Sequence, residues 1–133
     1  MIEMECKVMG ELDHPDRYGR IYSKDAIEKA VKNFNGKTYR FGELGYPTTQ
    51  QIDIGKISHE VNGVSFDGSA LKANIQLLDT PSGKIAQQIL NSGREIKFRP
   101  RVLTHSEKVK KGRGKHTNKE VITEMEIISF DIV

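Results

Sequence analysis

Residues 93–103 read Gly-Arg-Glu-Ile-Lys-Phe-Arg-Pro-Arg-Val-Leu, and they join the end of a helical pattern to the start of a strand pattern. Gly93 follows apolar residues of helical spacing, as a C-terminal cap does. Residues 95–103 are enriched in Ile and Val with partial alternation, which predicts a β-strand. The chain is therefore expected to change from helix to strand at this point.

Two helices are predicted along the chain. The first follows Ser23, a typical N-cap residue, and stops at Asn35-Gly36. The second begins at Thr80 with Pro81 in its first turn, where a missing N–H costs nothing. Their apolar faces consist of Ile27, Ala30, Val31 and Phe34 in the first helix and of Ile85, Ala86, Ile89 and Leu90 in the second.

Most of the remaining chain has strand character. Residues 52–61, 71–78 and 121–132 share the Ile and Val enrichment of residues 95–103, and Asn62-Gly63 and Asp67-Gly68 have the chemistry of turns. Two helices among several strands predict an α+β domain. A chain of 133 residues has the length of one domain and can bury its own core.

Residues 42–47 read Gly-Glu-Leu-Gly-Tyr-Pro, and residues 93–101 read Gly-Arg-Glu-Ile-Lys-Phe-Arg-Pro-Arg. Both segments resemble the active-site motifs of the prohead maturation proteases of T4-like tailed phages. Residues 42–47 are similar to the family's Gly-Glu-Leu-Asn/Asp/Gly-His-Pro motif, which supplies the catalytic base. Residues 93–101 are similar to its Gly-x-x-x-Gly-Val/Ile-Ser-Ser/Pro-Arg motif, which supplies the nucleophile. The resemblance places Tyr46 at the position of the histidine and Arg99 at the position of the serine.

The resemblance extends over nearly the whole chain in the family's order. Residues 18–31 look like the family's Asn-Gly-Arg-Ile-Tyr-Pro…Leu-Glu-Lys-Ala-Val opening, and residues 57–59, 78–83 and 128–133 also fit. It implies a herpesvirus-protease-like antiparallel β-barrel flanked by helices, as a single domain over residues 1–133. It also marks Tyr46, Arg99 and, with a weaker match, His59 as vestigial catalytic positions.

The substitutions remove the chemistry that a serine peptidase needs. A serine attacks an amide only when a neighbouring imidazole takes its proton. Tyrosine, whose ordinary pKa is about 10, stays protonated near neutral pH, and arginine stays charged and has no nucleophilic atom. We therefore expect a catalytically inactive relative. The alternative is an active endopeptidase with relocated residues, for which the conceivable nucleophiles are Ser58, Ser92 and Ser129 and the conceivable bases are His59 and His105.

The two substituted positions are expected to lie together if they belong to one vestigial site. Arg99 would then fill the former pocket, with its guanidinium stacked on the Tyr46 ring or paired with an acid such as Glu43. Side chains of Arg99 and Tyr46 on opposite faces of the domain would contradict a shared site.

Two histidines have both a structural and a functional interpretation. His59 is expected to be packed on a strand with one ring nitrogen hydrogen-bonded, and the alternative is a remnant of the catalytic group. His14 lies in Gly10-Glu-Leu-Asp-His-Pro15, which matches the base motif better than residues 42–47 do. It precedes the first predicted helix, whereas the family's base motif follows that helix, so we expect a solvated turn residue. The histidines and the lone Cys6 have no metal-ligand spacing, and we expect no metal or cofactor.

The strongest charge feature is a basic run over residues 108–119, with glycines at 112 and 114 that are typical of a hairpin tip. The candidate binding residues in it are Lys108, Lys110, Lys111, Arg113 and Lys115. A net charge of only +3 and the absence of aromatic residues in the run argue against nucleic acid as the partner. The alternatives are a solvated loop or docking on an acidic protein surface.

From this resemblance we expect an inhibitor of the prohead maturation protease that acts by binding, in the cytoplasm of the infected bacterium and in the prohead core. The expected partners are that protease or a scaffold or core protein, and a homo-oligomer is a further expectation. No apolar run approaches the ~18 residues that span a bilayer, so no membrane partner is expected. The alternative of a different class is a minor structural head protein with the same fold.

Overall fold

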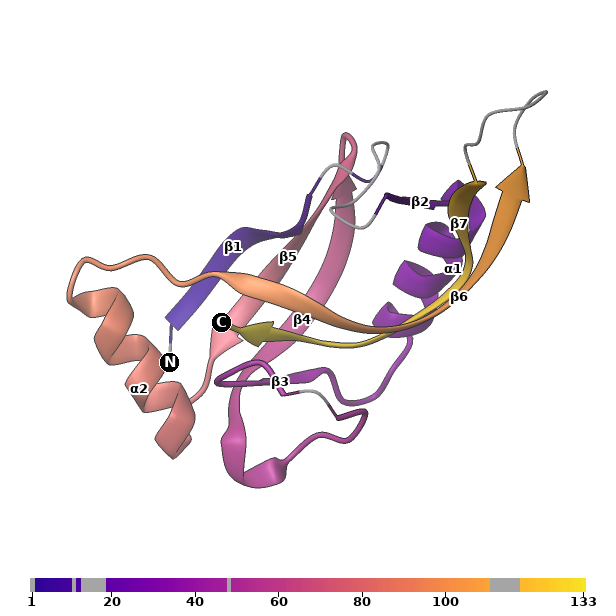
Figure 1. The fold of residues 1–133 in the computed structure, drawn as a ribbon. Helices are drawn as coiled ribbons and strands as arrows, with labels where there is room; N and C mark the ends of the chain where they lie inside the picture. Colours follow the sequence, from indigo (N-terminus) through magenta and orange to yellow (C-terminus); the bar gives the residue numbers. More distant parts are fainter. Residues whose placement is uncertain (1, 11, 13–18, 48, 111–117) are drawn as a thin grey trace.

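The structure is a computed structural model that describes residues 2–10, 12, 19–47, 49–110 and 118–133 (Figure 1). Its strands form two sheets, and a helix lies at either end of the long β6–β7 hairpin. None of the helices in the described part of the chain is long and apolar enough to span a membrane. The prediction of an α+β domain is confirmed.

The larger sheet is antiparallel and contains four strands in the order β1-β5-β4-β3. Their bounds are Ile2–Met9 for β1, Ala70–Leu77 for β5, Ile57–Asp67 for β4 and Phe41–Glu43 for β3. The predicted turn at Asp67-Gly68 is present, with Gly68 at φ +61°. The predicted turn at Asn62-Gly63 is wrong, because β4 continues through these residues with a bulge between Val61 and Gly63. The predicted strand over 52–61 begins only at Ile57, after a short 3-10 helix over Ile54–Lys56, η1.

The smaller sheet has the order β2-β7-β6. Its strands are β2 (Arg20–Tyr22), β6 (Phe98–Lys110) and β7 (Asn118–Ile132). β6 and β7 form a long antiparallel hairpin, and β2 runs parallel to the start of β7. A single parallel bridge between Leu44 and Ile132 connects the two sheets. Among the described residues the sheets do not close into a barrel, so the expected barrel stays a prediction.

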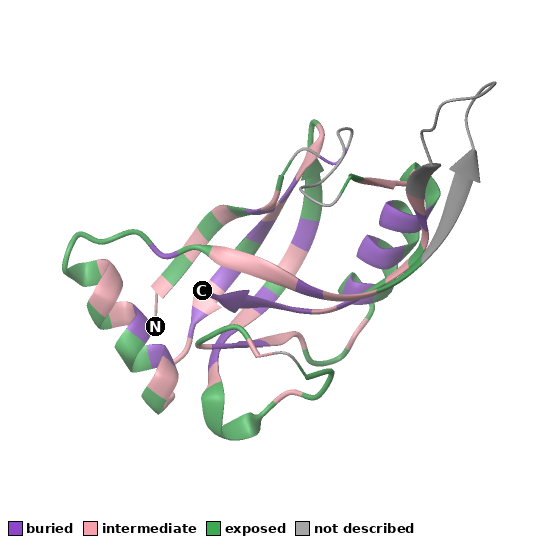
Figure 2. Cartoon of the chain, viewed as in Figure 1, coloured by how far each residue is buried: buried purple, intermediate pink, exposed green. Residues whose placement is uncertain are grey.

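Helix α1 (Lys24–Asn35) buries one face against β7 and β4. The Ser23 hydroxyl accepts a hydrogen bond from the Ala26 N–H at 3.0 Å, as an N-cap does. The predicted apolar face is buried, and the Phe34 ring contacts Phe130 of β7 edge to face at 5.4 Å. This contact anchors α1 on the end of the molecule opposite α2 (Figure 2).

Helix α2 (Pro81–Asn91) follows Thr80, whose hydroxyl accepts from the Gly83 N–H at 3.0 Å. Gly93 lies just beyond the C-cap at φ +84°, a conformation that favours glycine. The predicted apolar face is only partly covered, because Ala86 is buried whereas Ile85 is 48% exposed. Gly83 packs against the backbone carbonyls of Leu78 and Ser58, and this close approach holds the start of α2 on the larger sheet.

Candidate functional site

Tyr46 and Arg99 lie in direct contact. The guanidinium carbon of Arg99 is 4.7 Å from the centroid of the Tyr46 ring, within the range of a cation–π interaction. The Tyr46 hydroxyl donates a 2.7 Å hydrogen bond to the carbonyl of Pro100. Tyr46 is 36% exposed, so the pair lies at the surface. The structure therefore brings together the two positions that the sequence marked as vestigial, although Tyr46 follows β3 of the larger sheet and Arg99 lies on β6 of the smaller sheet.

The backbone between β3 and β7 explains this contact. The Gly45 N–H donates to the Ile132 carbonyl at 2.8 Å, which extends the Leu44–Ile132 bridge by one hydrogen bond. Gly45 has φ +90°, and the turn that it makes directs the chain toward β6. Tyr46 thus reaches the first residues of β6, where Arg99 lies.

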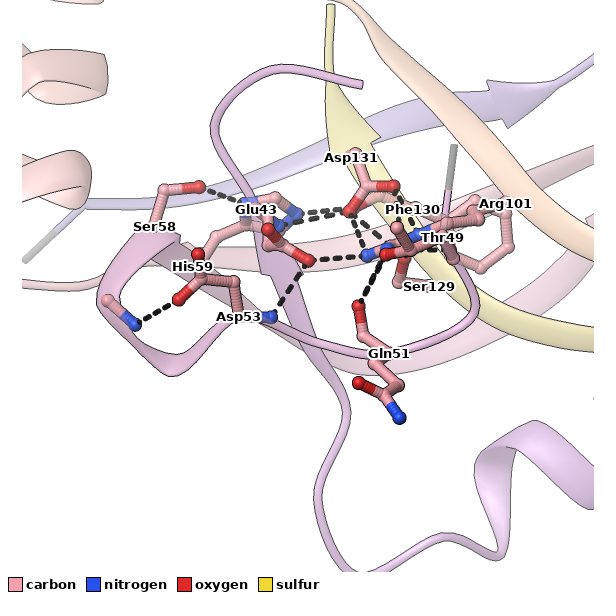
Figure 3. Close-up of polar contacts among 11 residues, drawn as sticks. Glu43, Thr49, Gln51, Asp53, Ser58, His59, Arg101, Ser129, Phe130 and Asp131 are labelled. Atoms are coloured by element: carbon pink, nitrogen blue, oxygen red, sulfur yellow. Dashed lines mark hydrogen bonds and ion pairs between the residues drawn. The ribbon is translucent and has the colours of Figure 1, made fainter. Parts of the chain in front are cut away.

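Arg101, two residues farther along β6, forms a buried ionic cluster with Glu43 and Asp131 (Figure 3). Its Nη2 donates to Glu43 Oε2 at 2.8 Å, and its Nε lies 3.0 Å from Asp131 Oδ2. Ser129 accepts from Arg101 Nε at 3.0 Å and donates to Asp131 Oδ1 at 2.9 Å. The Glu43 N–H also donates to Asp131 Oδ1, at 3.0 Å. The cluster therefore connects β3, β6 and β7.

The cluster contains two carboxylates and one guanidinium, all at most 4% exposed. Burial raises the pKa of the Asp131 carboxyl, against the lowering effects of the Glu43 N–H, the Ser129 hydroxyl and the Arg101 guanidinium. The expected alternative in which Glu43 pairs with Arg99 is wrong, because the Glu43 carboxylate is buried against Arg101.

Sequence reasoning missed the cluster as a unit. A signal was present, because Ser129 and Asp131 alternate with apolar residues at the end of β7, and Arg99 and Arg101 lie at alternate positions at the start of β6. Register places Arg101 opposite Ser129 and Arg99 opposite Asp131. The pairing register was needed to recognise that these residues share one face.

His59 is fully buried and hydrogen-bonded at both ring nitrogens. Its Nε2 lies 2.5 Å from the Phe130 carbonyl, which can only accept, so Nε2 carries the proton and Nδ1 accepts from the Ser58 hydroxyl at 2.7 Å. Burial lowers the pKa of His59 to about 4, although the bond to Phe130 opposes this shift. The ring is therefore neutral near pH 7, and the expectation of a packed, hydrogen-bonded histidine is confirmed.

Ser58 and His59 are hydrogen-bonded to each other as a nucleophile and its base are, but a substrate has no access to them. Both residues are 0% exposed, so a peptide cannot reach the Ser58 hydroxyl in this conformation. Gly42 of β3 packs directly on the His59 ring and on the Phe130 carbonyl, where a Cβ atom would collide with both. This packing closes the pair from the β3 side.

The other candidates from the sequence are dispersed. Ser92 caps α2 and donates to the Ile89 carbonyl at 2.6 Å, Ser129 belongs to the Arg101 cluster, and His105 is exposed on β6. Lys108 and Lys110 lie at the end of β6, opposite Glu120 and Asn118. His14, Lys111, Arg113 and Lys115 lie outside the described residues. Within the described ranges, no three His, Cys, Asp or Glu side chains are grouped to hold a metal ion.

Comparison with known proteins finds similarity in structure and not in sequence. No protein-family model matches the chain, and no curated protein matches it. Among solved structures, the chain is similar to the bacteriophage T4 capsid assembly protease, gp21, with a TM-score of 0.79 and 18% sequence identity. The match covers 98% of this chain and 80% of the T4 protein. At this identity the comparison establishes that the chain has the fold of a phage capsid assembly protease.

Proposed function

We propose that this chain is a catalytically inactive homologue of the phage prohead protease that inhibits the active protease by binding to it during capsid assembly. The observation that carries the proposal is the contact between Tyr46 and Arg99 at 4.7 Å. These residues occupy the positions where the motifs of the prohead proteases have the base and the nucleophile. Their proximity is what a shared ancestral active site requires.

Neither side chain supplies the missing chemistry. The Tyr46 hydroxyl already donates to the Pro100 carbonyl, and a neutral phenol does not take a proton from an attacking group. The Arg99 guanidinium lies against the ring with no nucleophilic atom. A site built in this way stabilises local structure and leaves no group to attack a peptide bond.

An active endopeptidase is the alternative that one observation favours. The Ser58 hydroxyl donates to the proton-accepting nitrogen of His59 at 2.7 Å, as in a serine hydrolase. Catalysis by this pair would require β3 to move away, because both residues are fully buried and Gly42 covers the ring. The inactive protein needs no such rearrangement, so we favour it.

Inhibition by a protein of this fold has a simple physical basis. A subunit with the fold of the protease retains surfaces through which protease subunits associate, and it adds no catalytic group to a mixed assembly. In the cytoplasm of the infected bacterium, and then in the prohead core, such an assembly would hold the protease inactive. A protein that binds only scaffold or core proteins would instead be a structural component of the head.

The test combines active-site labelling with partner capture. We expect no covalent labelling of the purified chain by a fluorophosphonate, and co-purification with the prohead protease encoded by the same phage. Labelling that is lost in Ser58→Ala, with Ser92→Ala as the matched exposed control, would overturn the assignment as an inactive homologue. Capture of scaffold proteins without the protease would contradict the inhibitory role.

A further inference from the structure

An apolar groove of about 520 Å³ lies beside the segment that joins β3 to β4. Phe41 of β3, Ile128 of β7 and Tyr39, which precedes β3, line it, and the rings of Tyr39 and Phe41 are stacked at 5.8 Å. Residues 50–54 contribute Gln50, Ile52 and Ile54. Tyr39 is 73% exposed and Ile54 is 83% exposed, so the apolar lining is open to solvent on both sides.

Residues 49–53, which we call the strap, form one boundary of this groove without belonging to a helix or a strand. In Figure 1 the chain between β3 and β4 loops out at the lower edge of the view. Except for the half-buried Ile52, every residue of the strap is exposed. Such a segment has little packing of its own to hold it in place.

Two buried side chains tie the strap to the sheets. Arg101 Nη1 donates to the Thr49 carbonyl and to the Gln51 carbonyl, each at 3.1 Å. The Asp53 N–H donates to Glu43 Oε2 at 3.2 Å, the same oxygen that accepts from Arg101 at 2.8 Å. Among the hydrogen bonds of the described residues, those that join the strap to β3 and β6 are these three (Figure 3).

We propose that the strap is a movable wall of the apolar groove, latched by Arg101 and Glu43, and that its release widens the groove and exposes the half-buried side chain of Ile52. The latch is in place only while the guanidinium keeps its orientation, because one nitrogen serves the strap and the others serve Glu43, Asp131 and Ser129. The device is independent of the proposed function, since it requires neither a protease nor a catalytic group.

The geometry of the arginine suggests a selective test. Arg101→Lys keeps one positive charge between the two carboxylates but offers a single nitrogen, which cannot serve both the carboxylates and the two strap carbonyls. Ser129→Ala is the matched control, because Ser129 belongs to the same buried cluster and has no bond to the strap. The reporter is the Asp53 amide, which is bonded to Glu43.

We expect the hydrogen exchange of the Asp53 amide to accelerate about tenfold or more in Arg101→Lys. The loss of charge-assisted hydrogen bonds to the strap raises the population of its open state by about that factor. Core amides such as that of Ile75 should exchange as slowly as in Ser129→Ala. Binding of 1-anilinonaphthalene-8-sulfonate should rise in Arg101→Lys and not in Ser129→Ala.

A second variant covers the case in which Arg101→Lys does not fold. Glu43→Gln keeps the shape of the side chain and weakens the acceptor of the Asp53 amide, so exchange of that amide should again accelerate. An unchanged Asp53 amide in the folded variants, or equal acceleration at Asp53 and Ile75, would overturn the proposal.

Discussion

At the scale of single residues, a histidine and an arginine show how position decides chemistry in this molecule. His59 forms a hydrogen bond with a serine hydroxyl yet lies beneath β3, where the ring is neutral and closed to solvent. Arg99 lies at the surface against Tyr46, whereas Arg101, two residues away, is buried with two carboxylates. The same type of side chain therefore packs against an aromatic ring in one case and joins three strands in the other.

The buried state of His59 predicts an acid-sensitive fold. The pKa is lowered from 6.5 to about 4 on folding, so the unfolded chain takes up a proton that the folded chain refuses. This contribution to stability is present above about pH 6.5 and is lost as the pH falls toward 4. We expect the free energy of unfolding in urea to fall by about 2 kcal/mol between pH 7 and pH 5 from this group.

Two substitutions separate this effect from other titrations. His59→Gln should lower the stability at pH 7 and remove most of the difference between pH 7 and pH 5. His105→Gln, at an exposed position on β6, should leave the difference unchanged. A pH dependence that persists in His59→Gln would contradict the assignment.

The sequence predicted part of the site and not the rest. The motif positions predicted that Tyr46 and Arg99 lie together, and the two side chains are in contact. The sequence did not predict that Glu43 pairs with Arg101, because that pairing depends on the register of β6 against β7 and on the bulge between Gly42 and Glu43. Neither feature has a signature in the local sequence.

At the scale of elements, the short strand β3 matters more than its three residues suggest. Gly42 allows β3 to approach the His59 ring and the Phe130 carbonyl, and Glu43 then reaches the Arg101 cluster. β3 also carries the chain to the Leu44–Ile132 bridge between the sheets. The position of Tyr46 depends on this close approach.

Gly42→Ala should therefore be among the most destabilising single methyl additions in the chain. The new Cβ atom would meet a backbone carbonyl and a buried ring, neither of which can move without separating β3 from β7. We expect a loss of about 3 kcal/mol or more in the free energy of unfolding. Gly63→Ala is the matched control, because a Cβ atom at Gly63 of β4 meets nothing within 4 Å.

The control should change stability by no more than about 1 kcal/mol, in the stabilising direction. Equal effects of the two substitutions in chemical denaturation would show that the close approach of β3 is not required.

Helices were easier to predict than strand ends. Ser23 and Thr80 cap the helices as expected because capping is a local interaction, and the helix apolar spacing is regular. The boundary of β4 was missed because Ile52 and Ile54, which have strand propensity, line a groove outside the sheet. The Asn62-Gly63 pair did not make a turn because β4 pairs with β5 on both sides of it.

At the scale of the whole molecule, two features bear on association with a partner. The fold is that of a phage capsid assembly protease, and the sequence carries its densest positive charge in residues 108–119. A charged segment accelerates association with an acidic surface through long-range attraction, which salt screens over a Debye length of about 8 Å.

The basic run predicts salt-sensitive association. Replacing Lys110, Lys111 and Arg113 with glutamine should slow the association rate with an acidic partner several-fold at low salt and leave the dissociation rate nearly unchanged. Stopped-flow or surface-based kinetics at two salt concentrations measure both rates. An association rate of the unmodified chain that does not depend on salt would exclude this segment from steering.

The central claim is tested most directly by the initial rate at which the prohead protease proposed as the partner cleaves its substrate, measured across a titration with this chain. We predict that the chain alone gives no cleavage and that the rate of the protease falls to a plateau as the chain approaches equimolar amounts. Cleavage by the chain alone, or a protease rate that stays constant throughout the titration, would contradict the account.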